Sequence, residues 1–292
     1  MEEKEVKWQG KTDGTPFMHR ALIALCRVLP LEIMYFFMAT AIPFYLVFNH
    51  KGYISIYHYF RRRMGRGPLW SFFSVCYNHL VFGAVVIDKF ACFAGKRFKT
   101  RIMNKELIDK LLSSDKGFVM VGSHVGNGEI AGFSFNSPKR INSLVFAGEA
   151  ADVMASRRDT FAAHNVRMVP VSEDMSHMFT LSSAIRDGEV ACIYGDRIFS
   201  STRNVRLPFM GVDADFPQGP FALAASMGVP AISVFVMKEG IRKYRIWLYE
   251  ISSGGESRSE IVEGMASCYA GDLEGMMRKY PSQWFNFYEF WG

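Results

Sequence analysis

The sequence has few of the patterns that mark disulfide scaffolds or metal centres. Its 292 residues include five cysteines, which are scattered, odd in number and never spaced as Cys-x-x-Cys. We therefore expect reduced thiols in a cytoplasmic compartment. No His, Cys, Asp and Glu cluster has metal-ligand spacing and no Walker-type phosphate loop is present, so we predict no metal and no resident cofactor.

The sequence also lacks internal repeats and low-complexity linkers that would divide it into separate globular units. Residues 2–11 are charged and hydrophilic, which argues against a secretory signal peptide. Residues 33–48 are uncharged, but a spanning helix needs about 20 residues and Pro43 interrupts this run. We expect a membrane anchor here, either spanning or interfacial; a buried core helix is the alternative.

What the sequence has in abundance is apolar and basic side chains. It is 49% hydrophobic, contains 26 Phe and 17 Met, and carries a formal net charge of +6. The positive charge is concentrated in two groups, Arg61, Arg62, Arg63 and Arg66, and Lys96, Arg97, Lys99 and Arg101. Because both groups flank apolar segments, we expect contact with an anionic membrane surface and none with nucleic acid; a solvated helix face is the alternative.

Downstream of residue 100, apolar runs and amphipathic stretches alternate. This pattern predicts an α/β fold with a mostly parallel central sheet and helices on both faces. An N-terminal helical, membrane-associated portion (1–100) would precede one α/β catalytic portion (101–292). We expect strands over 118–121, 142–148, 166–171, 190–195, 230–237 and 244–251. Helices are expected over 70–95 (one long helix or a helix pair), 104–114, 150–164, 175–186, 217–228 and 257–279.

The stretch Gly117–Gly132, GFVMVGSHVGNGEIAG, is the centre of this pattern. A short apolar strand ends in a turn with three glycines in seven residues, and a helix should follow with Asn127 as its N-cap. His124 then lies just past the end of a strand and Glu129 lies in the first helical turn. This is the usual position of functional residues in an open α/β sheet.

The spacing between His124 and Glu129 suggests general-base chemistry. A carboxylate on one imidazole nitrogen would fix the tautomer and leave the other nitrogen to take a proton from an attacking hydroxyl or amine. The alternative is a turn-capping histidine followed by an ordinary first-turn acid. The glycines do not fit the dinucleotide-binding fingerprint, and Ser123 is misplaced for a nucleophile elbow and poorly placed for a Ser–His dyad, so we expect direct transfer.

The block SHVGNGE, with a strand before it and a helix after it, resembles the H-x4-D/E motif of the bacterial lipid A late acyltransferase family, within the lysophospholipid acyltransferase superfamily. Further blocks follow in the order that the resemblance implies: Gly195-Asp196-Arg197, then residues 209–236, then YPSQWFNFYEFW over residues 280–291. The opening Trp8–Thr12 is also similar. Relatives often carry a tryptophan where this sequence has Gly128.

The resemblance implies a membrane-associated acyltransferase on the cytoplasmic face of a bacterial inner membrane. An acyl thioester on acyl-carrier protein or coenzyme A would be the donor, and a hydroxyl of a lipid A precursor or related glycolipid the acceptor. His124 would be the general base and Glu129 would orient it. The alternatives are a hydrolase acting on acyl thioesters or lipids, and a membrane-binding scaffold without catalysis.

Five further residues are candidates for substrate binding: Asn127, Arg157, Arg158, Asp196 and Arg197. Asp196 and Arg197 follow an apolar strand, so Arg197 would reach the same crevice as His124 if the two strands are neighbours, and would hold a phosphate. A structural Asp–Arg ion pair is the alternative. The helix expected at Pro217 offers backbone N–H groups for an anion or the thioester oxygen. Chain length, acceptor and donor are left open.

Overall fold

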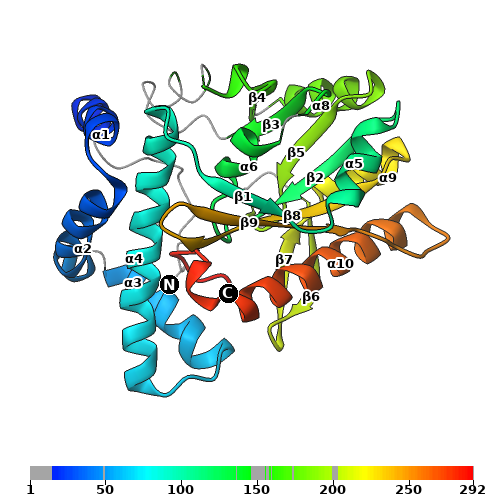
Figure 1. Cartoon of the computed structure of the whole chain (residues 1–292). Coiled ribbons are helices and arrows are strands. Elements are labelled where there is room, and N and C mark those ends of the chain that lie inside the picture. The colour runs from blue at the N-terminus through cyan, green and yellow to red at the C-terminus, as the bar shows by residue number, and fades with distance from the viewer. Residues whose placement is uncertain are drawn as a thin grey trace.

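The computed structural model describes residues 15–48, 50–135, 137–145, 155, 158, 160–172, 174–198 and 203–291. A layer of N-terminal helices lies beside a seven-stranded sheet that carries further helices (Figure 1). The predicted fold class, α/β with a mostly parallel central sheet, is confirmed. The division into portions 1–100 and 101–292 stays a prediction.

In the described part of the chain, the N-terminal layer contains α1 (Pro16–Val28), α2 (Leu31–Phe48), α3 (His50–His58), a π-helical turn (Tyr59–Arg63) and α4 (Pro68–Phe93). Thr15 caps α1 because its hydroxyl accepts a hydrogen bond from the Met18 N–H. Pro68 opens α4, where its missing N–H costs nothing. The helices α1, α2 and α3 all pack against α4, so this 26-residue helix is the axis of the layer.

The central sheet has the strand order β1-β9-β8-β2-β5-β3-β4. Its strands are β1 (Lys99–Ile102), β2 (Phe118–Gly122), β3 (Ile141–Val145), β4 (Val166–Pro170), β5 (Val190–Tyr194), β8 (Ala231–Gly240) and β9 (Lys243–Glu250). From β8 to β4 the strands are parallel, whereas β9 is antiparallel to β8 and β1 is parallel to β9. A separate antiparallel hairpin joins β6 (Asn204–Phe209) to β7 (Val212–Pro217).

Helices cover both faces of the sheet (Figure 1). The helices α5 (Lys105–Ser113) and α6 (Glu129–Ser134) cover one face, and α8 (Ser176–Arg186), α9 (Gly219–Met227) and α10 (Arg258–Lys279) cover the other. In β2, Phe118 and Met120 pack with α5 and α6, while Val119 and Val121 pack with α8, α9 and α10. This is why β2 is a continuous apolar run: side chains alternate along a strand, and both faces are buried.

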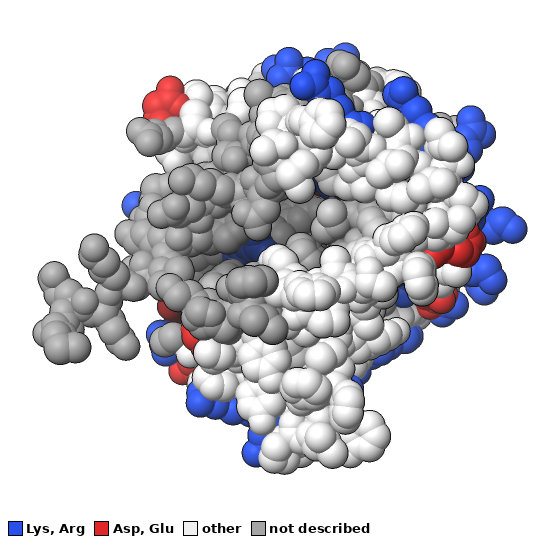
Figure 2. Space-filling model, turned by 90° about the vertical axis from the view of Figure 1, so that its left-hand side faces the viewer, with Lys and Arg blue, Asp and Glu red and all other residues white. Residues whose placement is uncertain are grey.

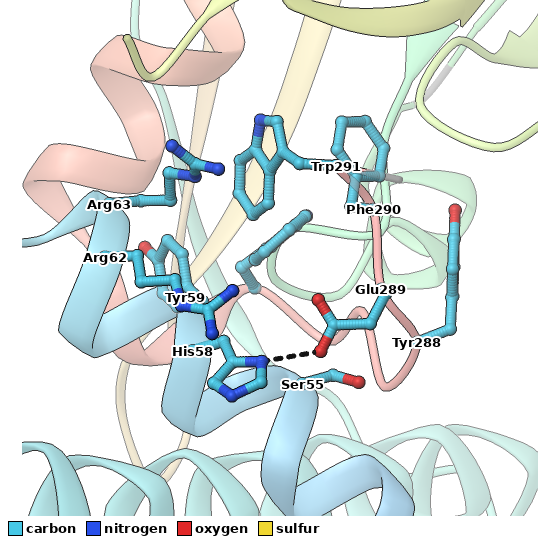
Figure 3. Close-up of a pocket in the computed structure, with 10 residues that line it drawn as sticks. Ser55, His58, Tyr59, Arg62, Arg63, Tyr288, Glu289, Phe290 and Trp291 are labelled. Atoms are coloured by element: carbon cyan, nitrogen blue, oxygen red, sulfur yellow. Dashed lines mark hydrogen bonds and ion pairs between the residues drawn. The ribbon is translucent and has the colours of Figure 1, made fainter. Parts of the chain in front are cut away.

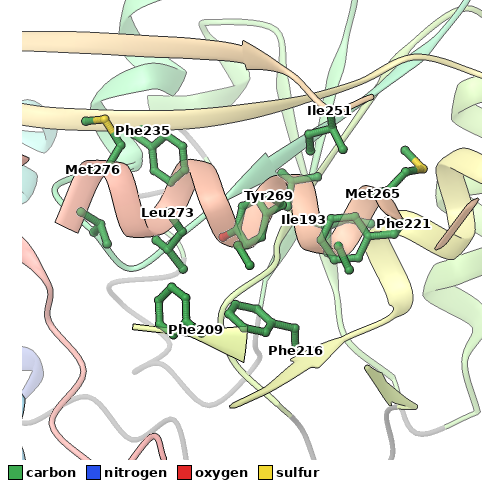
Figure 4. Close-up of a cluster of buried hydrophobic side chains, with 14 of the residues drawn as sticks. Ile193, Phe209, Phe216, Phe221, Phe235, Ile251, Met265, Tyr269, Leu273 and Met276 are labelled. Atoms are coloured by element: carbon green, nitrogen blue, oxygen red, sulfur yellow. The ribbon is translucent and has the colours of Figure 1, made fainter. Parts of the chain in front are cut away.

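The larger core cluster surrounds α10 (Figure 4). At its centre, the ring of Tyr269 packs against Phe216, Phe221 and Phe235, which joins α10 to the β6–β7 hairpin, α9 and β8. The Tyr269 hydroxyl donates a hydrogen bond of 2.7 Å to the carbonyl of Gly122. The core therefore fixes the carboxyl end of β2, just before His124.

One element prediction differs from the structure, and two elements were missed. Pro217 does not begin a helix; it ends β7 and pairs with Asn204, and α9 begins at Gly219 with Pro220 in its first turn. The β6–β7 hairpin and β1 were not predicted. The helix expected over 150–164 lies mostly outside the described residues.

Among the described helices, α4 is the one that is long and apolar enough to cross a membrane, and 44% of its most apolar window is buried in the fold. The apolar run 33–48 lies in α2, which continues through Pro43 and has a shorter apolar length, Leu31–Leu46. Whether either helix spans a membrane stays a prediction.

One side of the helical layer exposes large apolar side chains. The exposed apolar residues of α1, α2 and the first half of α4 include Phe17, Met18, Val28, Phe36, Phe37, Phe44, Leu69, Trp70, Phe73 and Tyr77. Figure 2 shows the face formed by α1 and α2, where the described surface is mostly uncharged and Lys and Arg lie mainly at the edges. We call this surface the apolar face.

Candidate active site

The site lies where β2 and β5 end. These strands are parallel neighbours and their last residues, Gly122 and Tyr194, are in register. His124 lies two residues after Gly122, and Asp196 lies two residues after Tyr194. The two side chains therefore meet at the same edge of the sheet. This is the crevice at strand ends where α/β sheets bind ligands.

Asp196 makes two hydrogen bonds to His124. Its Oδ1 lies 2.8 Å from the imidazole Nδ1, and its Oδ2 accepts a 2.6 Å hydrogen bond from the His124 backbone N–H. The Asp196 side chain is 2% exposed and that of His124 is 25% exposed. The carboxylate is thus sequestered, while the imidazole keeps an accessible edge.

The electrostatics of this pair favour a neutral imidazole beside an ionised carboxylate. Burial lowers the pKa of His124, and the positive charge of Arg197 lowers it further, against the opposing effect of Asp196. Burial alone would raise the pKa of Asp196, but its interaction and hydrogen bonds with His124 and the charge of Arg197 hold it below its ordinary value. Because a carboxylate only accepts, Nδ1 carries the proton and Nε2 is left as a base.

The carboxylate at Nδ1 of His124 is that of Asp196, whereas the sequence predicts Glu129 at one of the two imidazole nitrogens. Glu129 opens α6, and its carboxylate Oε1 lies 3.0 Å from Nζ of Lys89 on α4, with both side chains mostly buried. The reason is topological: α6 packs beside α4, whereas Asp196 lies directly opposite His124 on the neighbouring strand. The orienting role at Nδ1 is thus taken by Asp196, and a catalytic role of Glu129 stays a prediction.

The glycine-rich turn is held by backbone contacts from distant segments. Gly126 has φ +74°, and a Cβ there would lie 2.1 Å from the carbonyl oxygen of Val236, so only glycine fits. The Gly126 N–H donates to Gln283 O at 2.7 Å, and the Asn127 N–H donates to Val236 O at 2.8 Å. The turn is therefore fixed between β8 and the C-terminal segment.

Asn127 is not the N-cap of α6; Gly128 occupies that position without a side-chain cap. The Asn127 side chain is buried, and its amide donates to the Val85 carbonyl at 3.4 Å and to the Tyr244 hydroxyl at 3.3 Å. The N-cap prediction is wrong because the amide faces α4 and β9 instead of the helix start. These contacts tie the turn to both elements; substrate binding by Asn127 stays a prediction.

A buried ion pair beneath this amide was not anticipated from the sequence. Nζ of Lys238 lies 2.5 Å from Oδ2 of Asp88, whose side chain is 0% exposed, and the hydroxyls of Tyr35 and Tyr244 also donate to Asp88. Burial raises the pKa of Asp88 and lowers that of Lys238, while each charge counters the effect on the other. The group links α2 and α4 to β8 and β9, so the helical layer is anchored to the sheet.

The C-terminal segment, residues 284–291, forms another wall of the site. The Phe285 N–H donates to the His124 carbonyl at 3.2 Å, and Nη2 of Arg197 donates to the Phe285 carbonyl at 3.1 Å. The next residue, Asn286, is 2% exposed; Tyr288 lies beside its amide, but neither polar atom of the amide makes a hydrogen bond of normal geometry in the described structure. Buried amides are normally satisfied, so Asn286 is a candidate for a ligand contact that sequence reasoning missed.

The three arginines predicted to bind substrate differ in their positions. Arg197 does reach the crevice with His124 and Asp196, as predicted for neighbouring strands. Arg157 lies outside the described residues, and Arg158 is exposed. Phosphate binding by these arginines stays a prediction.

Two hollows in the described structure lie outside the contacts of His124 and Asp196. The smaller lies between the π-helical turn and the C-terminal segment (Figure 3), where His58 Nδ1 and Glu289 Oε1 are 2.8 Å apart and the Arg63 guanidinium lies over Trp291. Its volume is about 20 Å³, enough for one water molecule, so we exclude it as a substrate pocket. The larger has a volume of about 510 Å³ and is lined by Ala39, Ile42, Pro43, Leu46, Tyr53, Phe72, Cys76 and Leu80.

A partly exposed imidazole held by a buried carboxylate at the ends of parallel strands is an arrangement in which histidine can act as a general base. A family model described as bacterial lipid A biosynthesis acyltransferase matches residues 88–291. The chain therefore belongs to this acyltransferase family, and the matched region contains His124, Glu129, Asp196, Arg197 and Asn286. No curated protein matches the chain.

Proposed function

We propose that this protein transfers a fatty acyl group from an acyl thioester, carried by acyl-carrier protein or coenzyme A, to a hydroxyl of a lipid A precursor or a related glycolipid. The observation that carries the proposal is the contact between His124 and the buried carboxylate of Asp196. It supports a neutral imidazole whose Nε2 takes a proton from an acceptor hydroxyl.

The reaction proceeds without a covalent enzyme intermediate. His124 removes the hydroxyl proton as the acceptor oxygen bonds to the thioester carbonyl carbon. The C–S bond of the resulting tetrahedral intermediate then breaks, and the imidazolium returns the proton to the departing thiolate. Asp196 remains ionised and stabilises the imidazolium, so the products are an ester and a free thiol.

Charge develops on the thioester oxygen during the attack. The unpartnered amide of Asn286 and the cationic Arg197 both belong to the wall formed with Phe285, beside His124. We assign donation to the developing oxyanion to Asn286, because a preorganised donor in a dry site is effective there. Arg197 holds a phosphate of the donor or of the acceptor.

The 510 Å³ cavity fits the hydrocarbon chain. Its walls come from α2, α3 and α4 and are almost entirely apolar. Leu80 lines the cavity and lies five residues before Val85 on α4. The Val85 carbonyl accepts a hydrogen bond from Asn127 of the glycine-rich turn. The separation between Leu80 and Val85 is about 7.5 Å along α4, so the cavity and the contact of Asn127 share this helix.

The proposed location is the cytoplasmic face of a bacterial inner membrane. The apolar face of α1, α2 and α4 supports contact with the bilayer. The basic groups are only partly available for anionic lipids, because Arg61 donates to the Arg66 carbonyl and Arg66 donates to Ser74. Lys99 and Arg101 project from the edge strand β1 and are exposed.

The test is turnover of a radiolabelled acyl thioester by the purified protein in vesicles that contain a glycolipid acceptor. We expect labelled glycolipid from the wild type and none from His124→Ala, with His58→Ala as the control histidine variant outside the site. Labelled free fatty acid without acylated lipid would instead identify a hydrolase. Full activity of His124→Ala would refute the proposed chemistry.

A further inference from the structure

Tyr194 occupies space that two glycines of the catalytic turn leave open. It ends β5 in register with Gly122. A Cβ built on Gly122 would lie 2.8 Å from Tyr194 Cε1, and a Cβ on Gly128 would lie 2.1 Å from the Tyr194 hydroxyl oxygen. Both distances are shorter than real Cβ contacts, so a side chain at either position would require the Tyr194 ring to shift.

Backbone conformation does not account for these two glycines. Gly128 has φ −58°, which any residue adopts in a helix, and Gly122 is not among the positive-φ glycines. Gly126 is different: its φ of +74° and its approach to Val236 are required by the turn itself. The small size of Gly122 and Gly128 therefore serves the side chain of Tyr194.

The ring that enters this space packs on the catalytic imidazole. The ring centroids of Tyr194 and His124 are 4.8 Å apart with an interplanar angle of 74°, the edge-to-face arrangement that aromatic pairs prefer. Asp196, two residues after Tyr194, holds the Nδ1 of the same imidazole. The end of β5 thus supports His124 with a carboxylate and with a ring.

We propose that Tyr194 is a positioning residue for acyl transfer, which fixes the plane of the His124 imidazole and shields it from water. The proposal rests on the proposed role of His124 as base and deepens it. It also accounts for the lack of a side chain at Gly128, because the Tyr194 hydroxyl occupies the adjacent space. No substrate contact of Tyr194 is required.

The decisive measurement is the pH dependence of His124 modification by diethyl pyrocarbonate, followed by peptide mass spectrometry in the full-length protein. Tyr194→Phe keeps the ring and should match the wild type. Tyr194→Leu removes the ring, so the pKa of His124 should rise toward its ordinary value as water reaches the imidazole. An unchanged titration of His124 in Tyr194→Leu would overturn the proposal.

Kinetics of acyl transfer provide a second readout. Since the lost ring contact orients the base and does not bind substrate, Tyr194→Leu should lower kcat by about 2- to 12-fold with little change in KM. Tyr194→Phe should restore kcat. A rise in KM at constant kcat would mean that Tyr194 binds substrate, and would refute a positioning role.

The fit between Tyr194 and Gly128 can be tested by comparing the effect of Gly128→Ala in two backgrounds, the wild type and Tyr194→Phe. Gly128→Ala should lower the thermal midpoint, because its methyl group meets the Tyr194 hydroxyl at 2.1 Å. In the Tyr194→Phe background the nearest remaining ring atom is Cζ at 3.1 Å, so the loss should be much smaller. Equal losses in the two backgrounds would contradict the geometry.

These experiments separate the inference from the proposed function. The modification of His124 requires neither acyl donor nor acceptor, so it reports the support of the imidazole even if no transfer is observed. A wild type that transfers acyl groups, combined with a His124 titration insensitive to Tyr194→Leu, would leave the function intact and remove the role of Tyr194.

Discussion

Asp196 contacts His124 through both carboxylate oxygens, one on the imidazole Nδ1 and one on the backbone N–H. The first contact sets the tautomer and the second fixes the main chain that carries the ring. A substitution at Asp196 therefore changes both the basicity and the placement of His124. Its consequences are distinct from those expected at Glu129.

The pH profile of kcat/KM should report the pKa of His124 and how neighbouring charges shift it. Its pKa is lowered by burial and by Arg197 and raised by Asp196, so activity should persist below pH 6.5 and fall only as the imidazole protonates. Asp196→Asn should move this acidic limb to lower pH and reduce kcat by about 10²- to 10⁴-fold. Arg197→Gln should move the limb to higher pH. Shifts in the same direction would contradict the assigned electrostatics.

Glu129 and Lys89 should behave as a buried ion pair. Each substitution removes one partner of a mostly buried contact, so Glu129→Gln or Lys89→Met alone should lower the free energy of unfolding by about 1–3 kcal/mol. The double variant should recover much of this loss, measured by denaturant titration. If Glu129→Gln folds with normal stability yet has no transferase activity, Glu129 takes part in the chemistry as the H-x4-E resemblance implies.

The unpartnered amide of Asn286 should matter for the transition state. Asn286→Ala removes the proposed oxyanion donor and should reduce kcat by about 10²- to 10³-fold with little change in KM. The stability of the variant should be close to that of the wild type or higher, because a buried amide without partners contributes no hydrogen bond. A large loss of stability at unchanged kcat would show that Asn286 is structural.

The apolar cavity should set the acyl chain length. Leu80→Trp fills part of the 510 Å³ volume and should shift the products toward shorter chains, read by mass spectrometry of the acylated lipid. Leu69→Trp, at an exposed position of the same helix, is the matched control and should leave the chain distribution unchanged. Identical distributions in both variants would place the chain elsewhere.

Membrane binding should depend on the apolar face. Phe36 and Phe37 on α2 are 65% and 62% exposed, and Phe36→Glu combined with Phe37→Glu should weaken sedimentation with anionic vesicles. Phe179 on α8 is 75% exposed but lies away from this face, so Phe179→Glu should bind as the wild type does. Equal loss in both variants would indicate that the apolar face is not the contact surface.

The sequence was sufficient for the features that depend on local pattern. The apolar run 118–121, the glycine turn and the following helix start predict β2, His124 at the strand end and α6 at Glu129. The amphipathic stretch 104–114 likewise corresponds to α5, with Ile108 and Leu111 buried. These features follow from periodicity and turn chemistry, which a single chain segment carries.

The partner of His124 could not be predicted, because it depends on which strands are neighbours. Asp196 is 72 residues away along the chain, and its contact follows from the pairing of β2 with β5. Local spacing favoured Glu129, the nearest carboxylate in sequence. The Asp88–Lys238 pair escaped notice for the same reason, since its two charges are 150 residues apart along the chain.

The β6–β7 hairpin, in contrast, had a signal that was overlooked. Residues 204–209 alternate exposed polar or proline positions with buried Val205, Leu207 and Phe209, the period-2 pattern of a half-buried strand. Pro217 was assigned to a helix start because proline is common there. Its position at the end of β7 is equally compatible with a missing N–H.

Helix α4 runs without interruption from the exposed Trp70 to the backbone carbonyl of Val85, which holds the catalytic turn through Asn127. Fifteen residues of α-helix measure about 22 Å. Because the helix is continuous, its length fixes the distance between the exposed Trp70 and the turn that carries His124. Acceptors would then be chosen partly by how far their hydroxyl projects from the bilayer.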